Sequence, residues 1–196
     1  LGVIDPPYGI GRDGQKKGTS KHGGRKAHDF KGWDSYTPDA LFFAELRRVT
    51  KNQIIWGANY FSEYLPPSMG WILWDKGQRI MQSDGELAFT SFDRALRVVT
   101  INRVELLKDG TIHPTQKPIA LYEWTLRNYA KPGDKILDTH MGSQSSRIAA
   151  YKLGFDYWGS ELDADYFRDG CARFEKEIAM PLFDAIVQPK QEKLFL

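Results

Sequence analysis

Short hydrophobic runs alternate with amphipathic stretches along most of the chain. The hydrophobic runs are rich in β-branched and aromatic residues, which favour strands. Strands are expected at residues 1–4, 53–56, 71–75, 135–138 and 157–161, with a hairpin-like pair at 86–92 and 96–104. Helices are expected at 37–49, 118–130 and 145–153, followed by a last helix whose inner face carries Tyr166, Phe167, Cys171, Phe174 and Ile178. The alternation predicts an α/β fold, with a Rossmann-like open mixed sheet and helices on both faces.

The ends of two helices carry local signals of their own. Thr37 is the expected N-cap of the first helix, with Pro38 in its first turn. Its inward side chains are expected to be Leu41, Phe42, Leu46 and Val49. The helical pattern of the last helix is lost after Pro181, so residues 185–196 are expected to form a polar tail.

Size and composition place the chain among ordinary globular proteins. The 196 residues are 41% hydrophobic and 27% charged, which fits one domain over residues 1–196. No run reaches the roughly 18 apolar residues that a membrane span needs. The sequence begins at Leu1, inside a hydrophobic run and without an initiating Met, so we expect the natural chain to begin further upstream. The single cysteine, Cys171, forms no internal disulfide and argues against structural zinc, so a reducing, cytoplasmic location is expected.

Charge is concentrated in one glycine-rich stretch. Residues 11–31 hold seven Lys and Arg against two Asp, together with five Gly. Such a composition predicts a mobile basic loop that contacts nucleic-acid phosphates, or alternatively a solvated surface loop. The residues expected to make phosphate contacts are Lys16, Lys17, Lys21, Arg25 and Lys26.

Two segments carry the chemistry of a nucleoside site. Residues 136–146 run from a strand through a turn at Gly142 into a helix start, where backbone N–H groups face a ligand. Glu161 follows about twenty residues later at the end of the next strand, where an acid accepts ribose hydroxyls. Asp5-Pro6-Pro7-Tyr8 closes the first strand with fixed acceptors beside a ring, which suits a planar base bearing an amino group.

At these residues the sequence resembles the S-adenosylmethionine-dependent amino-methyltransferases of DNA, whose catalytic tetrapeptide is Asp-Pro-Pro-Tyr. The segment 138–146 resembles their cofactor motif, and His-Pro-Thr-Gln-Lys-Pro at 113–118 resembles the segment that precedes it. This motif order, a circular permutation of the class I methyltransferase arrangement, is that of the beta class. The sequences of residues 86–92 and 138–140 are similar to those of phage and prophage members of this class.

The resemblance implies adenine-N6 methylation of DNA after base flipping, with S-adenosylmethionine as cofactor. Asp5 and the Pro6 carbonyl would hold the target amine, next to Pro7, and Tyr8 would stack on the base. Gln144 stands where the family's turn has glycine, which would add bulk beside the cofactor. The implied cofactor contacts are Asp138, His140, Gly142, Ser143, Ser145, Ser146 and Glu161, with Thr115 and Lys117 as candidates for the carboxylate.

Other interpretations remain open. Cytosine-N4 methylation uses the same geometry, although Asp rather than Ser before the prolines favours adenine. A cofactor- and DNA-binding protein without activity is the third interpretation. Residues 60–110 are expected to form a small insert that recognises the target, and Asn59, Asp75 and Lys76 are possible DNA contacts. Trp56, Trp71 and Trp74 are expected in the core.

The C-terminal tail contains a second short pattern. Gln191, Leu194 and Phe195 form a Gln-x-x-Leu-Phe arrangement that resembles peptides docking into bacterial sliding clamps. The alternative is that the apolar tip folds back on the domain. The sequence indicates no oligomeric state.

Overall fold

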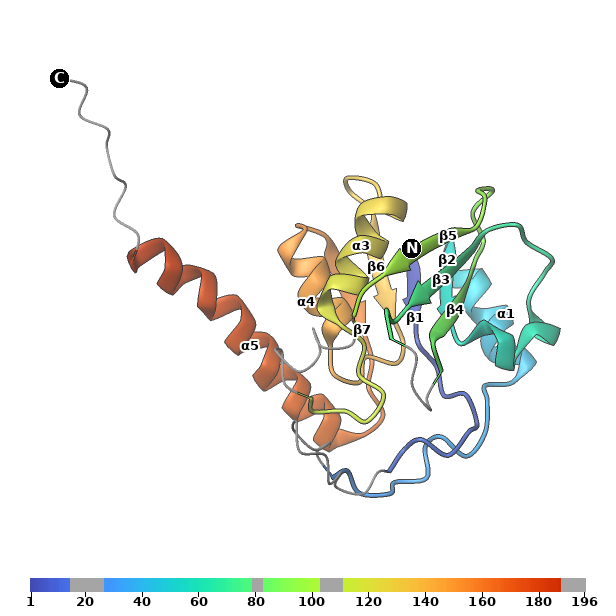
Figure 1. The fold of residues 1–196 in the computed structure, drawn as a ribbon, viewed down its shortest axis with the longest axis horizontal. Coiled ribbons are helices and arrows are strands. Elements are labelled where there is room, and N and C mark those ends of the chain that lie inside the picture. The colour runs from blue at the N-terminus through green and yellow to red at the C-terminus, as the bar shows by residue number, and fades with distance from the viewer. Residues whose placement is uncertain (15–26, 79–82, 103–110, 188–196) are drawn as a thin grey trace.

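A computed structural model describes residues 1–14, 27–78, 83–102 and 111–187, except for the side chains of 180–187 (Figure 1). Its centre is a seven-stranded sheet with the order β5-β3-β4-β2-β1-β6-β7. Every neighbouring pair is parallel except those of β4, which runs antiparallel to β2 and β3. The strands are β1 (Gly2–Ile4), β2 (Gln53–Trp56), β3 (Trp71–Asp75), β4 (Gly85–Thr90), β5 (Arg97–Thr100), β6 (Lys135–Asp138) and β7 (Asp156–Gly159).

Helices cover both faces of the sheet, which confirms the predicted fold class (Figure 1). One face packs on α3 and α4, and the other packs on α1. Two 3-10 turns follow β2, and α5 starts beside α4. The bounds are α1 (Ala40–Val49), η1 (Ala58–Tyr60), η2 (Ser62–Tyr64), α3 (Ile119–Tyr129), α4 (Ser145–Lys152) and α5 (Ala164–Val187).

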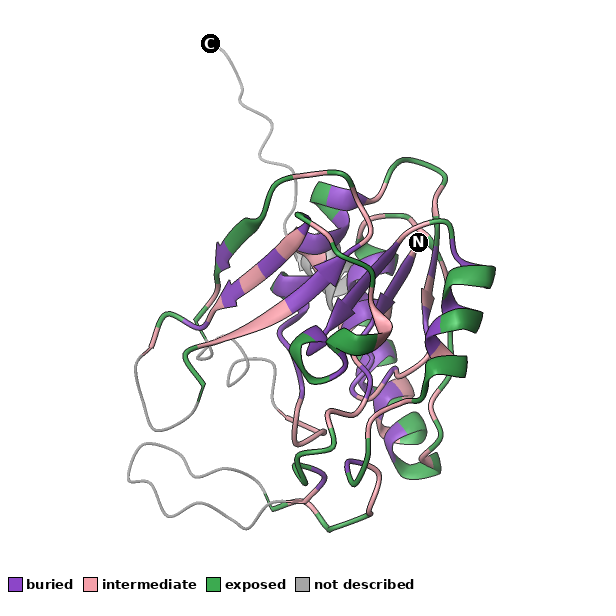
Figure 2. Cartoon of the chain, turned by 90° about the vertical axis from the view of Figure 1, so that its right-hand side faces the viewer, coloured by how far each residue is buried: buried purple, intermediate pink, exposed green. Residues whose placement is uncertain are grey.

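The strand side chains alternate between two hydrophobic clusters. Val3 and Ile54 face the cluster of α3 and α4, whereas Ile4 and Ile55 face that of α1. Both faces of β1 and β2 are therefore buried, as Figure 2 shows, which explains why these strands read as continuous apolar runs. Trp56 and Trp74 are buried in the core as expected, and Trp71 is half-buried against the α1 cluster.

Three sequence expectations about these elements are wrong. The N-cap of α1 is Asp39 rather than Thr37, because the Asp39 carboxylate accepts the Phe42 N–H at 3.0 Å. The segments at 86–92 and 96–104 do not form a hairpin, since β3 lies between β4 and β5 and pairs with both. The helix α5 continues through Pro181 to Val187, because a proline removes one backbone hydrogen bond without removing those of the flanking turns.

The inward faces of two helices also differ in detail. In α1, Phe43 and Leu46 are buried, whereas Leu41 and Val49 are exposed. Phe43 and Leu46 are three residues apart and therefore share the side of the helix that packs on the sheet. In α5, Phe167 is 46% exposed, whereas Tyr166 and Phe174 of the predicted face are buried.

Sheet topology predicts a ligand site between β1 and β6. These strands are parallel neighbours, and the chain continues from β1 to β2 on one side but from β6 to β7 on the other. Connections that leave in opposite directions open a crevice at the carboxyl ends of the two strands. Asp5 follows β1 directly, and Asp138 ends β6. The tetrapeptide and the glycine turn therefore meet at this switch point.

Candidate active site

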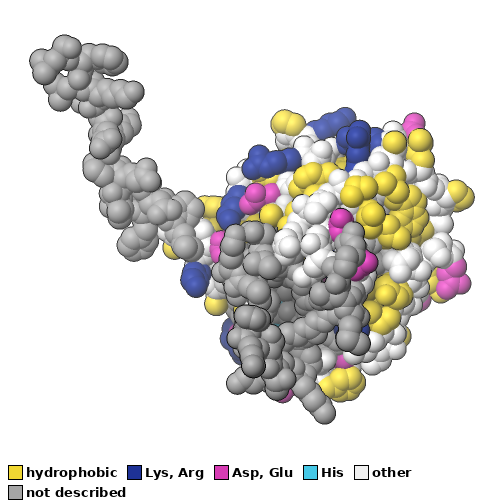
Figure 3. Space-filling view, in the orientation of Figure 1, with side chains coloured by type: hydrophobic (Ala, Val, Ile, Leu, Met, Phe, Trp, Pro, Cys, Tyr) yellow, Lys and Arg dark blue, Asp and Glu magenta, His cyan; other side chains and the backbone are white. Residues whose placement is uncertain are grey.

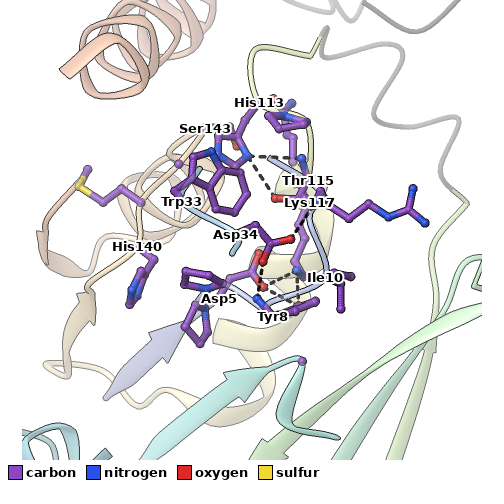
Figure 4. A pocket seen from close by; sticks show the side chains of 18 of the residues that line it. Asp5, Tyr8, Ile10, Trp33, Asp34, His113, Thr115, Lys117, His140 and Ser143 are labelled. Atoms are coloured by element: carbon purple, nitrogen blue, oxygen red, sulfur yellow. Dashed lines mark hydrogen bonds and ion pairs between the residues drawn. The ribbon is translucent and has the colours of Figure 1, made fainter. Parts of the chain in front are cut away.

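A cavity of about 1190 Å³ opens at the carboxyl ends of β1 and β6. Its wall includes the whole tetrapeptide, Asp5 to Tyr8, as well as the turn at Gly142 and the carboxylate-bearing Glu161. Lys117 and Trp33 also line this cavity (Figure 4). Segments separated by more than a hundred residues in sequence thus share one cavity.

The buried side chain of Asp34 holds the loop after the tetrapeptide. Its carboxylate accepts the backbone N–H groups of Tyr8 and Gly9 at 2.8 Å each and that of Arg12 at 2.7 Å. Asp34 is 2% exposed, so these three donors satisfy a carboxylate removed from water. The turn that carries Tyr8 is therefore fixed from outside the tetrapeptide, by a residue that the sequence pattern did not single out.

Asp5 lies in a cluster of four charged side chains. Lys117 Nζ is 2.6 Å from Asp5 Oδ1 and 3.1 Å from Glu86 Oε2. Lys76 Nζ binds the other oxygen of Glu86 at 2.8 Å. The Tyr8 hydroxyl donates to Asp5 Oδ1 at 2.6 Å and accepts from Lys117 at 3.0 Å. The two carboxylates and the two ammonium groups thus balance in charge and lie within hydrogen-bond distance of one another along the chain of contacts. Figure 4 shows Asp5, Tyr8 and Lys117 of this cluster.

Burial and neighbouring charge act in opposite directions in this cluster. Burial raises the pKa of Asp5, and Lys117 opposes the rise while Glu86 adds to it. Burial would also raise the pKa of Glu86, but Lys117 and Lys76 outweigh it and lower that pKa to about 2. Glu86 is consequently an anion at neutral pH, and Lys117 is its cation, with a pKa raised by the two carboxylates against the effect of burial.

The ring of Tyr8 packs between backbone and a second tyrosine. It stacks on Tyr60 with ring centroids 5.0 Å apart and planes inclined by 16°. Gly57, at φ +69°, lies so close that a Cβ there would be 2.0 Å from Tyr8 Cε1. Only glycine fits this position, for both its backbone conformation and its distance from the ring.

The glycine turn and Glu161 contact each other directly. Glu161 accepts the Gly142 N–H at 2.7 Å with one oxygen and the Asp163 N–H at 2.9 Å with the other. Asp138 accepts the His140 N–H at 2.9 Å and the Ser146 hydroxyl. Burial raises the pKa of Asp138 to about 7, even though both hydrogen bonds lower it. Asp138 therefore stabilises the turn through these hydrogen bonds without lining the cavity, whereas Glu161 lines it.

The remaining expected cofactor residues divide between wall and support. Ser143, Ser145, Thr115 and His140 line the cavity. The Ser145 hydroxyl donates to the Lys117 carbonyl at 2.8 Å, and the Ser146 hydroxyl contacts Asp138 and lies 3.0 Å from the Tyr157 hydroxyl. Lys117, expected near the cofactor carboxylate, pairs instead with Asp5 and Glu86.

Two histidines at the cavity are neutral at physiological pH. Burial lowers the pKa of His140 to about 4 and that of His113 to about 3. His113 stacks on Trp33 at 5.1 Å between centroids and meets the edge of Tyr166 at 4.3 Å. These rings serve as flat, uncharged walls rather than as cations.

The side chain of Gln144 points away from the cavity, in contrast to the bulk expected beside the cofactor. It is fully buried against α5, where Nε2 donates to the Phe167 carbonyl at 3.2 Å. Arg147 donates to its Oε1 at 2.8 Å. Its backbone has φ +60°, the left-handed region that glycine adopts without strain. The side-chain contacts offset a backbone cost of about 1–2 kcal/mol.

The packing of Gln144 on α5 predicts a coupled pair of substitutions. A Cβ at Gly170 would lie 2.7 Å from Gln144 Cγ, so Gly170→Ala should destabilise the fold by about 1–3 kcal/mol. In a Gln144→Gly background the same change should become stabilising, by up to about 1 kcal/mol, because alanine is the better helix former. Denaturant unfolding of the four proteins measures this coupling. An equal effect of Gly170→Ala in both backgrounds would contradict the packing.

Several expected contacts lie outside the described residues. These are the basic residues Lys16, Lys17, Lys21, Arg25 and Lys26 and the tail residues Gln191, Leu194 and Phe195. Within the described ranges, Asn59 lines the cavity and Lys76 is nearly buried on Glu86. The surface visible in Figure 3 carries charges of both signs, so it does not single out a second area for phosphate contacts. The predicted DNA contact therefore still depends on the composition of residues 11–31.

The fold and the cavity define a doubly wound α/β protein with its ligand site at the switch point. A family model described as DNA methylase, of the N6/N4 type, matches residues 55–171. The chain belongs to this family.

Curated relatives match over shorter segments. The Type II methyltransferase M2.DpnII of Streptococcus pneumoniae is 37% identical over 65 residues, which cover 33% of this chain and 24% of that protein. The Type II methyltransferase M1.MboII of Moraxella bovis is 41% identical over 54 residues, which cover 28% of this chain and 21% of that protein. The matches thus span about a quarter or less of the relatives' lengths.

Solved structures match over most of the chain. The M1.HpyAVI–SAM complex superposes with a TM-score of 0.56 at 21% identity, covering 88% of this chain and 87% of that one. PvuII DNA methyltransferase, described as cytosine-N4-specific, gives 0.52 at 12% identity, covering 91% and 83%. At such identities these similarities establish the shared fold, and they include an enzyme whose target is cytosine.

Proposed function

We propose that this chain transfers a methyl group from S-adenosylmethionine to the exocyclic N6 amine of adenine in DNA. The observation that carries the proposal is the meeting of Asp5 and Tyr8 with the Gly142 turn and Glu161 in one cavity. Family membership supports methylation of an exocyclic amine of DNA. The cavity has room for a nucleoside cofactor and an extruded base together, since ligand pockets of roughly 300–1,000 Å³ hold drug-sized molecules.

The residues fit the cofactor at its ribose and at its turn. Glu161 presents its carboxylate at the cavity wall and is held by the Gly142 and Asp163 N–H groups. The positive φ of Gly142, +46°, brings the turn's backbone close to the cavity without a side chain. When bound, S-adenosylmethionine supplies a methyl group activated by a positively charged sulfonium.

Asp5 and the Pro6 carbonyl act on the target amine. An amine conjugated to a purine is a poor nucleophile because its lone pair is delocalised into the ring. Two acceptors favour the pyramidal nitrogen whose lone pair points at the methyl group, so alignment and electrostatics lower the barrier. Because Tyr8 and Lys117 both bind Oδ1 of Asp5, we assign the acceptor role to Oδ2.

Access to the amine requires the base to leave the duplex. Flipping costs a few kcal/mol, which stacking on an aromatic ring worth ~1–3 kcal/mol partly offsets. Tyr8 and Tyr60, which stack on each other, are among the aromatic side chains of the cavity wall. The basic stretch at 11–31 is proposed to bind the phosphates alongside. Two further predictions stay untested. One is the sliding-clamp contact through Gln191, Leu194 and Phe195, and the other is the cytoplasmic location. Among the described residues, no helix has the length and apolar composition of a membrane span.

The proposal is tested by product identity. The chain is incubated with tritium-labelled S-adenosylmethionine and DNA of mixed sequence, and the DNA is digested to nucleosides and separated. Label in N6-methyladenine is the expected result. Label in N4-methylcytosine instead would support the cytosine alternative, which the fold shared with a cytosine-N4-specific enzyme keeps open. DNA binding and cofactor binding without label in any nucleoside would favour the inactive alternative.

Replacing Glu161 should affect cofactor affinity more than maximal rate. Glu161→Ala removes a carboxylate from the ribose and releases the Gly142 N–H that it accepts. The loss of charged hydrogen bonds, about 1.5–3 kcal/mol, corresponds to roughly 10- to 100-fold weaker binding. Calorimetric titration with S-adenosylmethionine measures the effect, and Glu161→Gln should recover part of it. An unchanged dissociation constant would contradict the assignment.

A further inference from the structure

Glu86 has no assigned role in the proposed chemistry, yet it touches three side chains around Asp5. Its Oε2 contacts Lys117 at 3.1 Å and the Tyr8 hydroxyl at 3.5 Å, and its Oε1 contacts Lys76 at 2.8 Å. Its side chain is 23% exposed and both of its oxygens are engaged. A carboxylate paired with two lysines, one on each oxygen, is suited to position those lysines.

Lys117 is shared between two carboxylates. Its side chain is 3% exposed, and it lies 2.6 Å from Asp5 and 3.1 Å from Glu86. A single lysine paired with Asp5 alone would neutralise that carboxylate most strongly, and a neutralised carboxylate is a weaker hydrogen-bond acceptor. Because Glu86 also pairs with Lys117, the ammonium group interacts less strongly with Asp5, and its Nζ is held in a fixed position. Lys76 in turn fixes Glu86 by pairing with its other oxygen.

We propose that Glu86 is a positioning residue for Asp5, which acts through Lys117 by dividing one buried ammonium between two carboxylates. The inference rests on the proposed function for its kinetic consequences. Lys117 is thereby assigned to the target-amine side of the cavity, where its contacts lie, rather than to the cofactor carboxylate.

The arrangement has a distinctive pH signature. The groups that face Asp5 are Lys117, Glu86 and the Tyr8 and Tyr122 hydroxyls, with Asp138 on the neighbouring strand and Lys76 behind Glu86. Lys117 lowers the pKa of Asp5 and Glu86 raises it. Removing Glu86 should therefore move the acid limb of the rate profile to lower pH, whereas removing Lys117 should move it to higher pH. Loss of folding alone would not move the two variants in opposite directions.

The experiment compares Glu86→Gln with Lys117→Met over a range of pH under single-turnover conditions. Glu86→Gln should lower the single-turnover rate constant by about tenfold, because Asp5 is misplaced and over-neutralised, and leave the cofactor concentration for half-maximal rate unchanged. Adding Glu86→Gln to Lys117→Met should change the rate little further, since the two act as one unit. The matched control is Glu177→Gln, a carboxylate 19% exposed that pairs with Lys152 at 3.4 Å on α5.

A second readout does not depend on DNA methylation. ¹³C-carboxyl titration of Asp5 by NMR should follow the same opposite shifts in Glu86→Gln and Lys117→Met. If Lys117→Met does not fold, the lower-pH shift in Glu86→Gln decides the matter alone. An unchanged titration of Asp5 in Glu86→Gln, or a shift to higher pH, would overturn the inference. A wild-type chain that labels no nucleoside would refute the proposed function while leaving this titration fully informative.

Discussion

Replacing Asp5 by alanine is expected to reduce methyl transfer by roughly 100- to 10,000-fold while cofactor binding survives. Asp5 is the proposed side-chain acceptor for the target amine, and it lines the same cavity as Glu161 and the Gly142 turn. Removing the carboxylate leaves the amine planar and conjugated, so its lone pair is not directed at the methyl group. Single-turnover transfer from labelled cofactor measures the rate, and calorimetry measures cofactor affinity in the same preparation.

Loss of folding must be separated from loss of chemistry. Lys117 is almost fully buried, and breaking a buried ion pair costs about 3–5 kcal/mol. Asp5→Asn, which keeps the shape of the side chain, is therefore measured alongside. Asp134→Ala is the control: its carboxylate accepts the Lys131 N–H at 2.8 Å in the turn before β6, at the opposite end of the sheet. Turnover of Asp5→Ala within tenfold of wild type would refute the catalytic role.

Replacing Gly57 by alanine is expected to reduce methyl transfer by about 100-fold although no reacting group is changed. A methyl group there would lie 2.0 Å from Cε1 and 2.3 Å from Cζ of the Tyr8 ring. The ring must therefore move, and its hydroxyl must leave Asp5 Oδ1. Displacements of about 1 Å in a positioned site lower rates by this order.

A substitution at a second glycine serves as the control for backbone strain. Gly133 has φ +85° and no atom within 4 Å of an added Cβ, so Gly133→Ala carries the strain without the collision. Backbone strain should cost each variant about 1–2 kcal/mol of stability, the collision should add to this in Gly57→Ala, and only Gly57→Ala should lose activity. The free energy of unfolding and the rate are measured for both. A folded Gly57→Ala protein with near wild-type turnover would show that the Tyr8 ring is free to move.

Local patterns in the sequence were sufficient for the site's main segments. Asp5 to Tyr8 and the turn at Gly142 each follow a buried parallel strand, so periodicity alone places them at carboxyl ends. The spacing from this turn to Glu161 predicted a nucleoside site, and the structure shows a hydrogen bond of 2.7 Å between Glu161 and Gly142. Element boundaries were less well determined, because Thr37 and Asp39 are both acceptable caps and only the final helix geometry selects one.

The sequence by itself determined the fold class, the core strands and the two segments that meet in the cavity, because these depend on periodicity and on motifs within single elements. The tertiary structure alone decided which charges meet Asp5. Glu86 stands near the start of β4, and a strand's start lies at the site only because β4 runs antiparallel to its neighbours. Lys117 comes from a loop more than a hundred residues away, and the direction of the Gln144 side chain depends on where α5 packs. Strand direction and long-range packing arise from the whole chain's burial, so no local pattern encodes them.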